Sequence, residues 1–127
     1  LFNRFNSGDK YVFSVPMWNF GLPYVLKHYI DLITQPGLAW AFTPESGYSG
    51  LVSGKVAVIY ATGGEYSAGS QTEAFDLQKP AFENWLAFIG LTDVSKIIIA
   101  PTLSDPTEVE KTLNSCIEVA KKTAKSF

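Results

Sequence analysis

The sequence has little of what disulfides, metal sites and membrane spans are made from. Its 127 residues include one cysteine and one histidine, so no internal disulfide and no His/Cys zinc cluster can form within one chain. A lone cysteine is typical of a reducing, intracellular compartment, and we expect a cytoplasmic protein. The longest unbroken apolar run, from Val56 to Ala61, is far too short to cross a bilayer, so we expect no membrane partner.

An excess of charge of one sign is also lacking. Ten Lys and Arg residues stand against twelve Asp and Glu, giving a net charge of -2. No basic block occurs, which argues against nucleic acid as a partner. Hydrophobic residues make up 46% of the chain and aromatic residues 14%, so we expect a packed core. The length fits one domain.

Short apolar strands alternate with periodic helices along the chain. The predicted strands are Tyr11–Val15, Lys55–Ala61 and Lys96–Ala100. Helices are predicted from Pro23 to Thr34, from Pro80 to Gly90, and onward from Asp105, and residues 1–10 read as the end of an earlier helix. This order predicts a parallel sheet that is covered by helices on both faces.

The last helix has clear sequence signals. Asp105 is placed as its N-cap, Pro106 as its first residue, and Glu108 where a capping box would have it. Cys116 lies on the apolar stripe of this helix, so we interpret it as a packed thiol rather than a reactive one.

Two strand ends carry unusual loops. The first strand runs into Met17-Trp18-Asn19-Phe20, and Lys55–Ala61 runs into Thr62-Gly63-Gly64. In an open α/β sheet, ligands bind beyond the carboxyl ends of the strands. Soft and aromatic side chains there suit a flat ring, and paired glycines let backbone N–H groups approach it. Taken alone, each loop has a more common explanation. An aromatic run after a strand is usually part of the core or of an interface, and Gly-Gly after a strand is usually an ordinary turn.

Two further features leave alternatives open. Residues 38–54 predict a hairpin or ordered excursion carrying Trp40 and Phe42, which cover either the protein's own core or a partner subunit or ligand. His28 lies off the apolar stripe of its helix, and is either a solvated residue or a proton-transfer group.

The segments of the sequence that carry a resemblance to known proteins are residues 15–20, 26–31, 50–55, 61–64 and 88–94. They resemble the FMN-dependent NADH-azoreductases and the wider group of flavodoxin-like NAD(P)H-quinone reductases. The resemblance implies a flavodoxin-like, doubly wound α/β fold. It also implies an enzyme that passes hydride from NADH or NADPH through FMN to quinone or azo acceptors. A homodimer with active sites between the subunits is implied as well.

The same resemblance implies which residues hold the cofactor. Those expected to flank the isoalloxazine ring are Pro16, Met17, Trp18, Asn19 and Phe20. Those expected at its edge are Thr62, Gly63 and Gly64, with Tyr66 nearby. No acid-base catalyst is assigned.

Part of the family's fold has no counterpart in the sequence. A flavodoxin-like sheet has five parallel strands in the order 2-1-3-4-5, and the predicted strands correspond to the third, fourth and fifth. The first two strands and the Ser-rich phosphate loop are missing, so we expect residues 1–127 to be the carboxyl-side portion of a single flavodoxin-like domain. By itself this portion is expected to be inactive. The alternatives are a flavodoxin-type electron carrier and a catalytically silent fragment.

Overall fold

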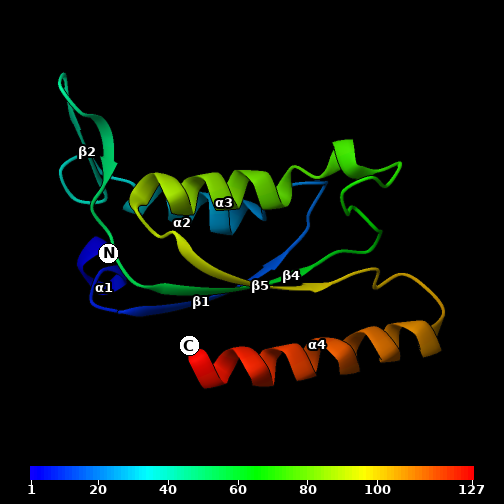
Figure 1. Ribbon diagram of the computed structural model, residues 1–127. Coiled ribbons are helices and arrows are strands. Elements are labelled where there is room, and N and C mark those ends of the chain that lie inside the picture. Colours follow the sequence, from blue (N-terminus) through cyan, green and yellow to red (C-terminus); the bar gives the residue numbers. More distant parts are fainter.

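The computed structural model describes residues 1–127, and its centre is a three-stranded parallel sheet (Figure 1). The strands are β1 (Lys10–Pro16), β4 (Lys55–Ala61) and β5 (Asp93–Ile99), in the order β1-β4-β5. The prediction of three parallel strands is confirmed. β5 begins at Asp93, three residues before the predicted Lys96. The prediction missed this start because the first residues of the strand are mostly polar and no apolar run marks them.

The core lies between one face of this sheet and the helices α2 (Tyr24–Ile33) and α3 (Gln78–Ile89), with α1 (Phe2–Phe5) at its margin. α3 begins at Gln78 rather than at the predicted Pro80. The Asp76 carboxylate accepts the N–H groups of Gln78 and of the residue that follows it, both at 3.1 Å, and this cap starts the helix earlier. Pro80 then falls in the first turn, where its missing N–H costs nothing.

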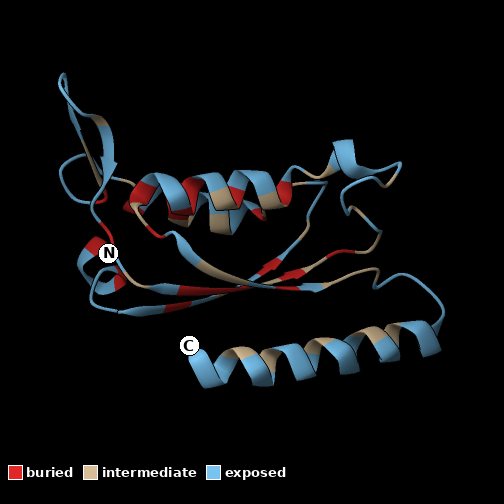
Figure 2. Ribbon diagram, in the orientation of Figure 1, coloured by how far each residue is buried: buried red, intermediate tan, exposed pale blue.

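The other face of the sheet is covered by α4 (Pro106–Ser126) alone. Asp105 caps it as predicted, accepting the N–H of Thr107 at 2.9 Å, but the Glu108 carboxylate binds Lys111 at 2.8 Å and forms no capping box. α4 has no buried residue (Figure 2). Cys116 is half-buried, and its thiol donates to Ile98 O at 3.2 Å, as a packed thiol would.

Two lysines hold the carboxyl end of α4. Lys10 Nζ donates to the backbone oxygen of Phe127 at 2.8 Å, and Lys55 Nζ donates to that of Ser126 at 2.9 Å. Cations at the carboxyl end of a helix interact favourably with the negative end of its dipole. The start of the sheet is thereby joined to the end of the chain.

The predicted excursion is a hairpin of β2 (Trp40–Thr43) and β3 (Gly47–Gly50). It stands apart from the sheet at the end of α3 (Figure 1). Its rings pack on Phe88 of α3, with centroids 5.6 Å from Trp40 and 5.8 Å from Tyr48. A short 3-10 helix, η1 (Glu73–Phe75), interrupts the crossover between β4 and α3. No helix of the chain is both long enough and apolar enough to span a bilayer.

Candidate functional site

The chain leaves β1 through a tight turn. Met17 N–H donates to Ala61 O at 2.9 Å and so prolongs the ladder between β1 and β4. Trp18 and Gly21 then exchange two backbone hydrogen bonds of 3.0 Å each. The central residues, Asn19 and Phe20, have φ values of 47° and 68°. Such angles cost a non-glycine residue about 1–3 kcal/mol, and backbone strain of this kind is concentrated at functional sites.

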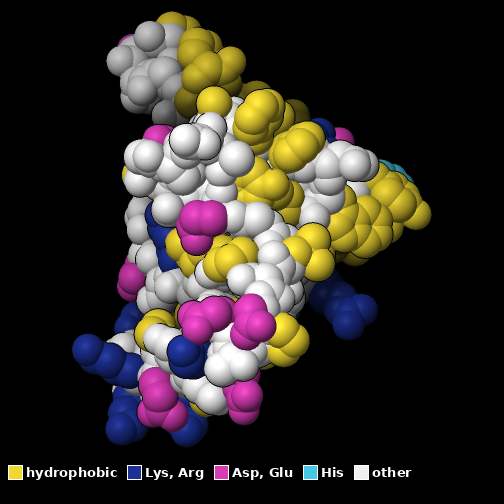
Figure 3. All heavy atoms as spheres, turned by 90° about the vertical axis from the view of Figure 1, so that its right-hand side faces the viewer, with side chains coloured by type: hydrophobic (Ala, Val, Ile, Leu, Met, Phe, Trp, Pro, Cys, Tyr) yellow, Lys and Arg dark blue, Asp and Glu magenta, His cyan; other side chains and the backbone are white.

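This turn presents its aromatic side chains outward. Trp18 is 51% exposed and Phe20 47% exposed, while Met17 is half-buried beside them. Pro16 and Asn19 are exposed at the strand end and in the turn. Figure 3 faces this edge of the sheet and shows hydrophobic side chains gathered over its upper part, with charged side chains below.

The loop after β4 is fixed by hydrogen bonds of its own. Thr62 is buried, and its hydroxyl donates to Gly64 O at 2.8 Å. Thr62 O accepts from the N–H of Thr102 at 2.9 Å and from its hydroxyl at 3.1 Å. Leu103 N–H donates to Gly63 O at 3.0 Å. The polar groups of Thr62 therefore hold the loop together and do not face outward.

The N–H groups of Gly63 and Gly64 remain available. Neither donates to any group in the structure, although both residues are half-buried. A Cβ at Gly63 would lie 2.9 Å from Leu103 Cδ1, and one at Gly64 would lie 3.3 Å from the ring of Tyr66. A side chain at either position would crowd a neighbouring side chain, and glycine avoids this while leaving two consecutive donors at the sheet edge.

The two loops lie side by side. Pro16 pairs with Ala61 in the parallel ladder, so both loops leave the sheet at the same level. They also touch, because the ring of Phe20 meets that of Tyr66 with centroids 6.4 Å apart. All nine residues predicted to contact the cofactor therefore lie at these two adjacent strand ends and on the loops that follow them. They are Pro16, Met17, Trp18, Asn19, Phe20, Thr62, Gly63, Gly64 and Tyr66.

Sequence reasoning missed a third loop. Leu103 follows β5 and is 85% exposed, with its side chain over Gly63. Phe75 also reaches the site, since its ring centroid lies 5.5 Å from that of Phe20. The rule that drew attention to the first two strand ends, applied to the third, would have found Leu103. Nothing in the sequence around Phe75 marks it.

The strongest electrostatic perturbation lies on the α3 side of the sheet. Burial raises the pKa of the Tyr60 phenol, and the adjacent Glu83 carboxylate raises it further. Tyr60 Oη donates to Glu83 at 3.4 Å, and Glu83 is paired with Lys96 at 2.6 Å. Tyr60 therefore stays neutral and packs in the hydrophobic core. His28, the other possible proton-transfer group, is exposed on α2.

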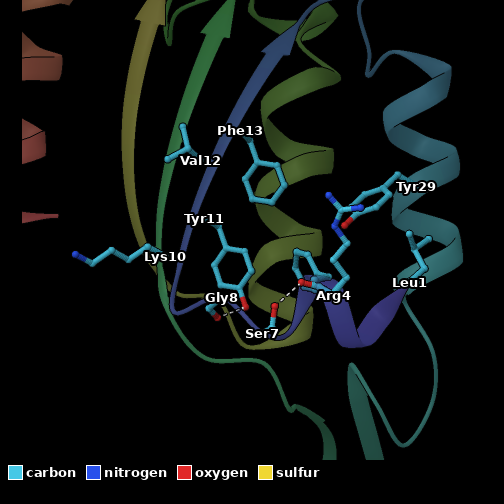
Figure 4. A pocket seen from close by; sticks show the side chains of 10 residues that line it. Leu1, Arg4, Ser7, Gly8, Lys10, Tyr11, Val12, Phe13 and Tyr29 are labelled. Atoms are coloured by element: carbon cyan, nitrogen blue, oxygen red, sulfur yellow. Dashed lines mark hydrogen bonds between the residues drawn. The ribbon is translucent and has the colours of Figure 1, made fainter.

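The largest cavity, about 750 Å³, is not at this site. It runs along the amino-terminal half of β1, beside α1 and Tyr29 of α2 (Figure 4). Tyr11 and Phe13 point into it from the strand, and Tyr11 Oη donates to Gly8 O at 2.8 Å. β1 is an edge strand, so its outer side is flanked by open space. We attribute the cavity to that open edge and place the candidate site at the strand ends.

Comparisons with known proteins agree with the fold described above. The model of a family described as having a flavodoxin-like fold matches residues 2–124. An FMN-dependent NADH:quinone oxidoreductase of Desulfotalea psychrophila is 49% identical over 114 residues, which are 89% of this chain and 53% of that protein. One from Nitratidesulfovibrio vulgaris is 43% identical over 125 residues, 97% of this chain and 59% of that protein.

Solved structures give the same result. The crystal structure of an azoreductase from Bacillus anthracis superposes with a TM-score of 0.91 at 31% identity, covering 99% of this chain and 60% of that one. An FMN-dependent NADH-azoreductase of the same species, solved in complex with FMN, superposes with a TM-score of 0.82 at 26% identity, covering 98% and 58%. The chain spans between half and three fifths of the length of these curated relatives and matches their C-terminal part.

Proposed function

Because the chain belongs to the flavodoxin-like family, we propose that it forms the ring-binding part of an FMN-dependent oxidoreductase that passes hydride from NADH or NADPH to quinone or azo acceptors. The names of its relatives support the cofactor, the donor and the acceptor classes. The observation in the chain itself that carries the proposal is the pair of free N–H groups at Gly63 and Gly64, on the loop adjacent to the one that carries the exposed ring of Trp18.

The residues present suit a flavin ring. Pro16 to Phe20 flank it, with Trp18 offering an exposed stacking face. Gly63 and Gly64 direct two donors at a heteroatom edge, and Tyr66 lies over Gly64. Bound FMN supplies the hydride chemistry, and the protein orients the ring and tunes its charge. Two fixed N–H donors at the sheet edge favour negative charge on whatever group they face, because they need no reorganisation.

The proposal is tested by FMN binding and NADH oxidation in the intact protein. We expect FMN to bind, and NADH to be oxidised in the presence of a benzoquinone or an azo dye, with acceptor consumed in step. Val119→Ala is the control and should leave both unchanged, because Val119 is exposed in the half of α4 whose end lies at the start of the sheet, away from the strand ends. FMN binding without NADH oxidation would instead identify a flavodoxin-type electron carrier. Absence of FMN binding would refute the assignment altogether.

We propose that the partner of this chain is a second copy, in a cytoplasmic homodimer. The hairpin carries Phe42 and Tyr48, both exposed and packed against each other at 5.0 Å. Exposed aromatic groups of this kind are characteristic of protein interfaces. In sedimentation experiments on the intact protein we expect a dimer, and Phe42→Ser should shift it toward monomer while Val119→Ser, at an exposed position of α4, does not. A monomeric, fully active parent protein at micromolar concentration would contradict the proposal.

A further inference from the structure

Phe20 occupies an unusual position, because its backbone and its side chain are both held by a different loop. It has a left-handed φ of 68°, as does its neighbour Asn19 with 47°. L-residues rarely adopt this conformation; the two Trp18–Gly21 hydrogen bonds close the turn from within, and further contacts hold it from outside. Those contacts come from residues 66–77, the crossover between β4 and α3.

Three contacts join Phe20 to this crossover. Leu77 N–H donates to Phe20 O at 3.0 Å. The ring of Phe20 meets Phe75 with centroids 5.5 Å apart, and it meets Tyr66 edge-on at 6.4 Å. These partners lie at the beginning and the end of the crossover. Phe20 thus fastens both ends of that segment to the turn after β1.

The contact with Tyr66 extends to the free N–H groups. The Tyr66 ring lies against Gly64, where an added Cβ would be 3.3 Å from Tyr66 Cε2 and 3.4 Å from its Oη. On its other side the Gly63 backbone is held by Leu103 N–H. A shift of the crossover would therefore be transmitted through Tyr66 to Gly64, whose carbonyl alone is held, by the Thr62 hydroxyl at 2.8 Å, whereas Gly63 is anchored by the loop after β5.

We propose that Phe20 is a positioning residue, which clamps the Tyr66–Leu77 crossover to the turn and thereby fixes the direction of the Gly64 N–H. The proposal rests on the proposed function in so far as that N–H faces the FMN ring. It differs from the expectation that Phe20 simply stacks on the ring. Trp18, which lies in the same turn but packs only near Tyr24 at 6.4 Å, provides the comparison.

The clamp is tested first without ligand, by hydrogen exchange in the intact protein. Phe20→Leu should speed amide exchange in residues 66–77 at least several-fold, and Phe75→Ala should do the same, while Trp18→Ala should leave it unchanged. Phe20→Tyr, which keeps the ring, should restore parental exchange. Unchanged exchange in both Phe20→Leu and Phe75→Ala would overturn the proposal. Because Phe75 is exposed, its variant keeps the test valid should Phe20→Leu fail to fold.

The second arm measures FMN affinity by fluorescence titration. Phe20→Leu and Phe75→Ala should each raise the dissociation constant by up to about tenfold, and the double variant should be no weaker than the weaker single one. Additive losses, or a loss in Phe20→Leu without faster exchange, would identify a direct ring contact and overturn the clamp. Should the parent bind no FMN, the proposed function fails, and the exchange measurements alone decide the clamp.

Discussion

Replacing Gly50 with alanine should displace the hairpin from the end of α3. A Cβ at Gly50 would lie 2.2 Å from Gly90 N and 2.3 Å from the carbonyl carbon of Ile89. Ordinary contacts of a Cβ lie between 3.4 and 4 Å. Both obstructing atoms belong to the backbone, so no side chain can rotate out of the way. The hairpin must therefore move away from the end of α3 by roughly an ångström, because neither backbone can give way by that much in a closely packed contact.

The structure gives the cost of that movement. The hydrogen bond from Val52 N–H to Ile89 O, now 2.9 Å, would be lost, at about 1 kcal/mol. The packing of Trp40 and Tyr48 on Phe88, at 5.6 and 5.8 Å, would loosen as well, at about 0.5–1.5 kcal/mol for each aromatic pair. We therefore expect Gly50→Ala to lower the free energy of unfolding by about 2–4 kcal/mol, a large part of the total for a domain.

Urea unfolding of the intact protein measures this loss, and the hairpin offers a matched control. Gly47 has a φ of 73° and no atom within 4 Å of an added Cβ. Gly47→Ala therefore introduces backbone strain alone, about 1–2 kcal/mol. The reasoning is refuted if Gly50→Ala is as stable as Gly47→Ala, or lies within about 0.5 kcal/mol of the parent.

Further predictions concern the site and the core. Trp18→Ala should weaken FMN binding by roughly threefold to tenfold, because a stacked ring contributes about 0.5–1.5 kcal/mol; parental affinity in a fluorescence titration would contradict the assignment. Gly64→Val should weaken it more in the same titration, since the new side chain meets the Tyr66 ring and covers the N–H. Tyr60→Phe should reduce the decrease in melting temperature that the parent protein shows above about pH 10. Burial raises the pKa of Tyr60 in the folded state, so only the unfolded chain ionises there and the parent loses stability as the pH rises; identical profiles would be evidence against this. Gly63→Ala should change the unfolding free energy little, because its Cβ meets the exposed and mobile end of Leu103, and adding Leu103→Ala should restore any loss.

The helices and strands could be predicted from the sequence where a single pattern, such as an apolar run, determined their bounds. β4 is buried on both faces, and its apolar run defined both of its ends, Lys55 and Ala61. The two boundaries that differ from the prediction by more than one residue lie where sequence signals compete. At β5, polar residues at a sheet edge concealed the strand start, and at α3 the Asp76 cap outweighed Pro80 as the point of initiation.

The candidate site was readable in location but not in detail. The strand-end rule selected both loops, and the structure places them together. The positive φ of Phe20 could not be foreseen, because phenylalanine rarely adopts that conformation, and the asparagine at position 19 is only a weak signal for it. Nor could the sequence show that the hydroxyl of Thr62 bonds to Gly64 O, since one hydroxyl suits a loop contact and a ligand equally. The assignment of the nine residues to a flavin stays a prediction.

The attachment of α4 has a consequence for the order in which the fold opens and closes. Its lysine contacts join residues 117 and 71 positions apart in the chain, and such distant closures carry the largest loop entropy. The apolar stripe of the helix meets Ile59, Ile97 and Ile99 of the sheet, but no residue of the helix becomes buried, so apolar contact offsets only part of that entropy. α4 should therefore dock after the sheet has formed, and undock while the sheet persists, as a separate cooperative unit. Its undocking should become easier as salt screens the two ammonium groups from the helix end.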